Sequence, residues 1–136
     1  MNRDSQIKSK SRVRDYAEVF TAQREVNAMC DLIPAKMYSE LERTFLEPAC
    51  GQGVFILEIL RRKFAFCKKR GDYTKALASV YGMDIQADNV DETIRNIVNL
   101  CQDDYGLKLS KSEREIINDH IMIADSLKVM KLLSIT

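Results

Sequence analysis

The apolar residues of this chain follow a helical period in some stretches and form short unbroken runs in others. Residues 23–33 place apolar side chains on one helical face, and Pro34 is expected to end that helix because proline restricts the residue before it. Residues 44–49 form a short apolar run that is typical of a buried strand. Residues 54–69 return to a helical period. The residues expected on the inner face of this helix are Ile56, Ile59, Leu60 and Phe64.

The second half of the chain continues this alternation. The expected elements are a turn at 71–73, a strand at 78–84, a helix at 87–101, a helix at 110–118 and a strand at 120–124. The apolar stripe of the helix at 87–101 consists of Val90, Ile94, Ile97, Val98 and Cys101. Ser110 is the expected N-cap of the helix that follows it. Strands separated by helices predict an α/β protein with about three parallel strands flanked by helices.

In open parallel sheets, ligands bind at the carboxyl ends of the strands. Three stretches follow the expected strands at these ends. They are residues 47–53, which contain two glycines, and the acids Asp84 and Asp125. Although they lie far apart in the sequence, these residues are expected to converge on one crevice.

Composition fits a single soluble domain. The chain has 136 residues, of which 46% are hydrophobic and 30% charged, and its formal net charge is +1. Basic residues dominate 1–14 and 61–75, whereas 84–104 carries six carboxylates against Arg95. Such blocks are either electrostatic footprints or solvated faces. We expect residues 1–15 to form a flexible basic segment and residues 16–136 to form the domain.

The sequence lacks the residues that several classes of site require. The four cysteines form no CxxC pair, and His120 is the only histidine, so we expect no metal site and no serine-type triad. No stretch resembles a signal peptide or a membrane span. We therefore expect a cytoplasmic protein with free thiols.

The glycine turn at 51–53 does not suit a phosphate ligand. A dinucleotide fingerprint needs a third glycine, where this chain has Ile56, and an acid about 20 residues later, whereas Asp84 comes much later. A P-loop needs a lysine followed by serine or threonine, which is absent here. S-adenosylmethionine lacks phosphate and requires only close backbone approach, a carboxylate near its ammonium group and an acid for the ribose hydroxyls. Glu47, Asp84 and Asp125 stand at suitable places in suitable order.

Four motifs in order resemble class I methyltransferases, and more narrowly the N6-adenine DNA methyltransferases of restriction–modification systems. Residues 47–53, EPACGQG, resemble the first motif, and 83–85, MDI, the second. Residues 124–127, ADSL, resemble the third, and 19–22, VFTA, resemble the V-F-T-P segment that precedes the first motif in that family. The resemblance implies a partial Rossmann-like methyltransferase fold, S-adenosylmethionine as cofactor, and DNA as the substrate of the complete enzyme.

The resemblance also implies roles for individual residues. Phe20 and Thr21 would contact the methionine moiety of the cofactor, which the turn at 47–53 would frame. Asp84 would hold the ribose, and Ile85 would lie against the adenine. The full set of residues implied in cofactor binding is Phe20, Thr21, Glu47, Pro48, Ala49, Gly51, Gly53, Asp84, Ile85, Asp125, Ser126 and Leu127.

Two departures limit what the resemblance implies. Ala22 replaces the usual proline, which loosens the start of a helix but removes no contact group. More importantly, the catalytic N/D-P-P-Y/F motif of the family, whose aromatic residue stacks on the flipped base, has no counterpart. The only prolines are Pro34 and Pro48. We expect no catalytic residue here and no methyl transfer by this chain alone, and DNA binding only with further residues or a partner subunit.

Other interpretations stay open at this point. The glycines suit an ordinary strand–helix turn, Asp84 and Asp125 suit helix caps, and Glu47 suits a partly buried structural acid. At the level of function, the alternatives are a non-catalytic methyltransferase-like regulatory module and a fragment of an RNA or protein methyltransferase. An incomplete sheet would leave an unpaired edge near the third strand, so we also expect self-association.

Overall fold

The structure is a computed structural model that describes residues 23–133 of the chain, so Phe20, Thr21 and residues 1–15 lie outside the described residues. It divides the chain into two units, Met1–Ile33 and Pro34–Thr136. In the first unit the chain is helical from 23 to 31. The helix ends earlier than predicted because the amides of Leu32 and Ile33 bond carbonyls only three residues back. Of its predicted apolar face, Val26 and Cys30 are buried, whereas Met29 is 55% exposed.

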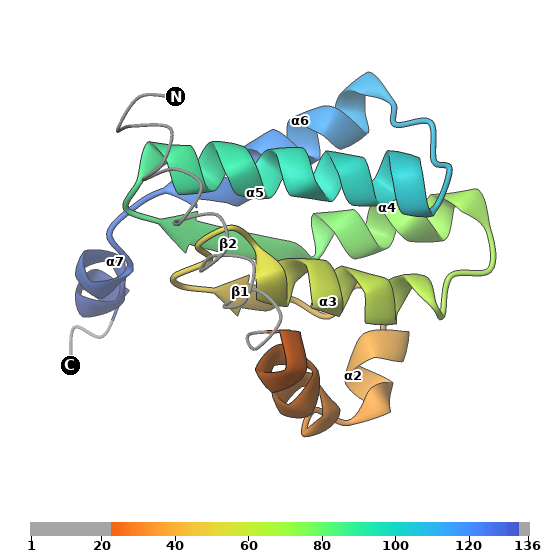
Figure 1. The fold of residues 1–136 in the computed structure, drawn as a ribbon, viewed down its shortest axis with the longest axis horizontal. Helices are drawn as coiled ribbons and strands as arrows, with labels where there is room; N and C mark the ends of the chain where they lie inside the picture. Colours follow the sequence, from red (N-terminus) through yellow and green to blue (C-terminus); the bar gives the residue numbers. More distant parts are fainter. Residues whose placement is uncertain (1–22, 134–136) are drawn as a thin grey trace, which may run out of the picture. The chain divides into compact units, whose positions relative to one another are not determined.

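The second unit contains the predicted parallel sheet. Its strands are β1 (Phe45–Glu47), β2 (Val80–Asp84) and β3 (Ile121–Ile123), in the order β1-β2-β3 (Figure 1). Both pairs of neighbouring strands are parallel, with Glu47 beside Gly82 and Asp84 beside Ile123. The α/β class is therefore confirmed. The strands are shorter than predicted, and His120 is the last residue of a helix rather than the first of a strand.

Helices connect the strands on the predicted pattern. The longer ones are α3 (Val54–Phe64), α5 (Ala87–Asn99) and α6 (Lys111–His120). All four residues predicted for the inner face of α3 are buried, and Ser110 caps α6 in a reciprocal pair with Glu113. On α5, the buried face includes Thr93, whereas Ile94 and Val98 are only half-buried. The predicted stripe is thus buried at Val90, Ile97 and Cys101 and partly covered at Ile94 and Val98.

Three segments of regular structure were missed. They are α2 (Ala35–Ser39), α4 (Arg70–Ala78) and a π-helical turn at Leu100–Asp104. Helix α7 (Ser126–Leu133) agrees with the alternative in which Asp125 caps a helix. Helix α3 ends at Phe64 instead of residue 69, and α4 begins where a turn was expected. The carboxylate of Asp72 accepts the amides of Lys68 and Lys69 at 2.9 and 3.2 Å, which caps the start of α4. Because α4 buries little besides Ala76 and Leu77, its apolar pattern is too weak to reveal it.

Burial varies along both faces of the sheet. Met83 is buried on the same face as the exposed Met122, and Ile123 is exposed on the same face as the buried Ile121. On one face, Val80 and Ile121 are buried, and a Cβ added to Gly82 would lie 2.5 Å from Cδ1 of Ile56 in α3. On the other face, Leu46 and Met122 are 53% and 40% exposed. Close packing of α3 on β2 thus depends on glycine at position 82. No helix among the described residues is long and apolar enough to cross a membrane.

Candidate functional site

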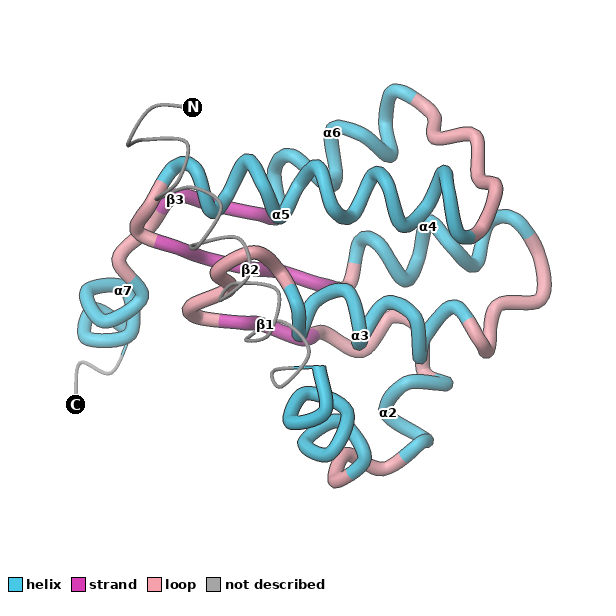
Figure 2. Tube along the Cα trace, in the orientation of Figure 1, coloured by secondary structure: helices cyan, strands magenta, loops and turns pink. Residues whose placement is uncertain are grey.

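The carboxyl ends of the three strands bring the three predicted stretches to one edge of the sheet. The loops that follow the strands lie at the same end in Figure 2. The amide of Cys50 donates to the carbonyl of Met83 at 2.7 Å, which joins the loop after β1 to β2. The amide of Ala124 donates to the carbonyl of Asp84 at 3.0 Å, which joins the loop after β3 to the same strand. The three stretches therefore lie at one edge of the sheet, as the strand order predicted.

Asp84 is the residue that links the glycine turn to the second strand. Its Oδ2 accepts the amide of Gly51 at 3.0 Å, and its Oδ1 accepts the amide of Gln86 at 2.9 Å and the side-chain amide of Asn89 at 3.2 Å. These hydrogen bonds, led by the one from Gln86, outweigh burial and lower the pKa of Asp84. A carboxylate offers about four acceptor positions, so three internal bonds leave room for about one more donor.

The two glycines of the turn are required for different reasons. Both have positive φ, 53° for Gly51 and 89° for Gly53. A Cβ on Gly53 would lie 2.8 Å from Cγ2 of Thr93, so Gly53 allows the turn to pack on α5. A Cβ on Gly51 would meet nothing within 4 Å. The space beside Gly51 is thus open to a ligand that approaches the backbone closely.

We expect Gly53→Ala to destabilise the protein more than Gly51→Ala. Both substitutions place a side chain at positive φ, which costs about 1–2 kcal/mol. Only Gly53→Ala adds a collision, because Thr93 is fully buried and has no room to move. Urea unfolding of the two variants would measure this difference. Equal losses of free energy would show that the turn relaxes away from α5 without cost.

One side of α5 holds the turn in place, a feature that sequence analysis missed. The hydroxyl of Thr93 donates to the carbonyl of Gly51 at 2.8 Å, and the side-chain amide of Asn96 donates to the carbonyl of Gln52 at 3.0 Å. Asn89, Thr93 and Asn96 recur at helical spacing. This polar row beside the apolar stripe was the available signal, because a buried polar side chain needs a hydrogen-bond partner.

Glu47 stands at the start of the same turn. Its Oε1 accepts the amide of Ala49 at 3.2 Å, and burial raises its pKa despite this bond. Within residues 23–133, no basic side chain forms an ion pair with it. A desolvated carboxylate of this kind gains most from a cation placed beside it.

The region after β3 is less enclosed. Oδ1 of Asp125 accepts the amides of Leu127 and Lys128 at 3.0 and 3.4 Å, so this acid caps α7, and Ser126 is the first residue of that helix. Leu127 and Ile85 are 78% and 67% exposed. The capping interpretation of Asp125 is thus seen directly, and the two apolar side chains are accessible at the same edge.

The other predicted site residues are Pro48, Ala49, Phe20 and Thr21, and Cys50 lies between Ala49 and Gly51 in the turn. Pro48 and Ala49 belong to the turn, where Pro48 is half-buried and Ala49 is exposed. Cys50 is buried, and burial, as the largest cause, raises the pKa of its thiol, which fits a packing role rather than a nucleophile. Phe20 and Thr21 lie outside the described residues, so the structure places neither of them.

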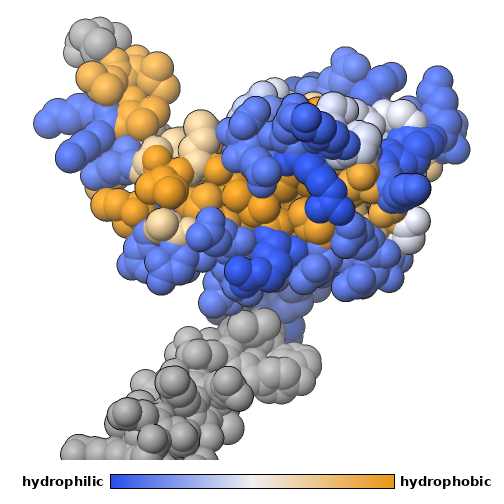
Figure 3. Space-filling model, turned by 90° about the horizontal axis from the view of Figure 1, so that it is seen from above, coloured by the Kyte–Doolittle hydropathy of each residue, from blue (hydrophilic) through white to orange (hydrophobic). Residues whose placement is uncertain are grey.

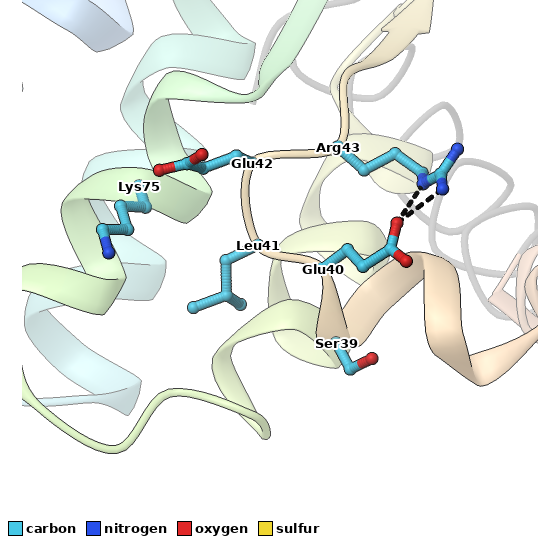
Figure 4. Close-up of a pocket in the computed structure, with 6 residues that line it drawn as sticks. All are labelled: Ser39, Glu40, Leu41, Glu42, Arg43 and Lys75. Carbon is cyan, nitrogen blue, oxygen red and sulfur yellow. Dashed lines mark hydrogen bonds and ion pairs between the residues drawn. The ribbon is translucent and has the colours of Figure 1, made fainter.

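A hollow of about 550 Å³ lies at the opposite edge of the sheet, where sequence analysis predicted nothing. It is lined by Ser39, Glu40, Leu41, Glu42, Arg43 and Lys75 (Figure 4). Glu40 and Arg43 already pair with each other, with Nε at 2.8 Å from the carboxylate. No group of three or more candidate metal ligands occurs among the described residues. We assign no ligand to this hollow.

Comparisons with protein-family models, with curated proteins and with solved structures each found no match. The likeness to N6-adenine DNA methyltransferases therefore stays a hypothesis carried by the four motifs. What the geometry adds is the arrangement of Glu47, Gly51 and Asp84 around one turn.

Proposed function

We propose that the carboxyl edge of this sheet binds S-adenosylmethionine, and that the chain is the cofactor-binding portion of a DNA (adenine-N6) methyltransferase of restriction–modification type. The observation that carries the proposal is the hydrogen bond from the amide of Gly51 to Asp84, beside the open space at Gly51. An ordinary strand–helix turn needs neither this link nor this space.

The proposed binding mode assigns one task to each group. Burial raises the pKa of Glu47, and its carboxylate faces the positively charged methionine end of the cofactor. Its hydrogen bonds lower the pKa of Asp84, so this side chain stays ionised. It accepts a ribose hydroxyl at its remaining acceptor position. The exposed side chains of Ile85 and Leu127 supply apolar surface for the adenine ring. The cofactor supplies the methyl group, and the chain's own residues bind and orient it.

The proposal ends at cofactor binding. The N/D-P-P-Y/F motif that would hold the target adenine has no counterpart in this chain. DNA binding and methyl transfer therefore require further residues or a partner subunit. The alternative, a non-catalytic regulatory module, would use the same cofactor site. It differs only in that no catalytic residues or subunit would complete it.

The sharpest test compares Gly51→Ala with Gly106→Ala. Both glycines have nearly the same positive φ, 53° and 59°, and a Cβ at either would meet nothing within 4 Å. The two variants should thus lose similar stability. Only Gly51→Ala places a methyl group where the cofactor would approach, so we expect its affinity for S-adenosylmethionine to fall at least about tenfold, or about 1.4 kcal/mol. Calorimetric titration would measure it.

A second variant tests the acid. Asp84→Asn should weaken S-adenosylmethionine binding, whereas Asp88→Asn, a control in the first turn of α5, should not. Equal affinities for the wild type, Gly51→Ala and Asp84→Asn would overturn the site. Absence of any binding by the folded wild type would overturn the proposal that this chain holds the cofactor.

A further inference from the structure

The ribose of the proposed cofactor has two hydroxyls, and Asp84 has room for one of them. Oδ1 of Asp84 already accepts two donors, the amide of Gln86 at 2.9 Å and the side-chain amide of Asn89 at 3.2 Å. Oδ2 accepts the amide of Gly51 at 3.0 Å. Each carboxylate oxygen has two lone pairs, so the open acceptor position lies on Oδ2. The second hydroxyl therefore needs another acceptor.

The side chain of Asn89 stands beside this carboxylate and offers such an acceptor. An asparagine amide has an NH2 group, which donates, and a carbonyl oxygen, which accepts. Because an ionised carboxylate only accepts, the NH2 group faces Asp84 and the carbonyl oxygen points elsewhere. Within residues 23–133 this carbonyl oxygen accepts no hydrogen bond. Asn89 is half-buried in the first turn of α5, so part of its side chain remains accessible to a ligand.

We propose that Asn89 is a second ribose ligand, which accepts the hydroxyl that Asp84 has no room for. The two hydroxyls are then bound by two side chains, one by Oδ2 of Asp84 and the other by the amide oxygen of Asn89. This role for Asn89 rests on the S-adenosylmethionine site proposed above. It adds a ligand that the second methyltransferase-like motif does not contain, because that motif covers only 83–85.

The direction of the cofactor assigns the hydroxyls to their acceptors. In ribose, the 3′-hydroxyl lies toward the carbon that bears the methionine arm, and the 2′-hydroxyl lies toward the adenine. The proposed binding mode places the methionine end at the turn that contains Gly51, to which Oδ2 of Asp84 is bonded. It places the adenine beside the exposed Ile85 and Leu127. Figure 3 shows apolar side chains gathered around α7, the helix that contains Leu127. Asp84 thus accepts the 3′-hydroxyl, and Asn89 accepts the 2′-hydroxyl.

The experiment is calorimetric titration with S-adenosylmethionine and with its 2′-deoxy and 3′-deoxy forms. For the wild type, loss of the 2′-hydroxyl should weaken binding about fivefold. Loss of the 3′-hydroxyl, whose partner is charged, should weaken it at least about tenfold. In Asn89→Leu the side chain keeps nearly the same shape but has no acceptor, so S-adenosylmethionine and its 2′-deoxy form should bind equally well. The loss for the 3′-deoxy form should remain.

Asn96→Leu is the matched control, because Asn96 lies on the same helix and its amide bonds the carbonyl of Gln52 instead of Asp84. It should leave the ratio between the S-adenosylmethionine and 2′-deoxy affinities as in the wild type, whatever it does to the affinities themselves. This ratio is measured within one protein, so a general loss of stability does not imitate the expected result.

The outcomes separate the role of Asn89 from the cofactor site itself. A wild type that binds S-adenosylmethionine and its 2′-deoxy form equally would overturn the role of Asn89 and leave the cofactor site standing, and this comparison needs no variant. A 2′-deoxy loss that persists in Asn89→Leu would overturn it as well, because Asp84 would then accept both hydroxyls. Absence of any S-adenosylmethionine binding by the wild type would overturn the cofactor site and this role together.

Discussion

Lys63→Ala is expected to lower the free energy of unfolding at pH 7 by about 3 kcal/mol, because it removes a fully buried side chain and its hydrogen bonds. The Lys63 ammonium donates to the carbonyls of Leu41 and Arg43 at 3.0 and 2.6 Å and to Oγ of Ser79 at 2.7 Å. It also lies 4.8 Å from the centre of the Phe45 ring. The side chain thus connects α3 to the segment that leads into β1.

Lys63→Met separates the charge from the packing. Methionine keeps most of the buried stem and loses the three donors, but it also removes a desolvated charge, so its loss should be smaller, about 1 kcal/mol. Lys75→Met, at an exposed position of α4, is the matched control and should change little. Urea unfolding of all three variants at pH 7 would give this ranking. A larger loss for Lys63→Met than for Lys63→Ala would contradict it.

The stability difference between wild type and Lys63→Met should change with pH in one direction. Burial, with the nearby charge of Arg43, lowers the pKa of Lys63 from 10.5 to about 8. Between these values the unfolded chain holds a proton that the folded chain has lost, so stability rises with pH. The wild type should therefore gain about 3 kcal/mol over Lys63→Met between pH 8 and 10.5. A constant difference over this range would show that the amine stays protonated.

The buried lysine also shows what the sequence did not reveal. Lys63 lies on the predicted inner face of α3, between Leu60 and Phe64, where the pattern alone assigns it to solvent. Its partners are carbonyls and a hydroxyl that come from distant residues, and no local pattern contains them. The strands and the larger helices followed from apolar spacing because that spacing records burial directly. Helix α4 did not, because polar contacts define it: the carboxylate of Asp72 caps its start, and its Arg70 and Thr74 bind Glu113.

The candidate site divides in the same way. The turn at Gly51, Asp84 at the end of β2 and their common edge followed from strand order alone. The role of Thr93 and Asn96 as supports of the turn did not, because it depends on how α5 is rotated. The sequence also does not show why each of the two glycines is required, because it gives the same residue type at both positions. Three-dimensional packing separates them, because a Cβ on Gly53 would collide with Thr93 of α5, whereas a Cβ on Gly51 would point into open space.

The largest electrostatic effect should appear at Glu113, which joins α6 to α4. Its side chain is 5% exposed and accepts both Nη1 and Nη2 of Arg70, at 2.8 and 2.7 Å. It also accepts the hydroxyl of Thr74 at 2.8 Å and the amide of Ser110 at 2.9 Å. Glu113→Gln keeps the shape of the side chain but removes its charge and replaces one acceptor oxygen with an NH2 donor. We expect this variant to lose about 3 kcal/mol at pH 7.

The pH dependence distinguishes this charged contact from simple packing. Burial alone would raise the pKa of Glu113, but the hydrogen bonds, led by Arg70, outweigh it and lower the pKa from 4.5 to about 2. Protonation therefore favours the unfolded chain. The contribution of Glu113 is complete above pH 4.5 and disappears as the pH falls toward 2. The stability difference between wild type and Glu113→Gln should shrink over that range, as denaturant unfolding at several pH values would measure.

Glu115→Gln, an exposed neighbour on α6, should show no such difference. A difference for Glu113→Gln that stayed constant down to pH 2 would mean that shape, and not charge, makes the contact between α4 and α6.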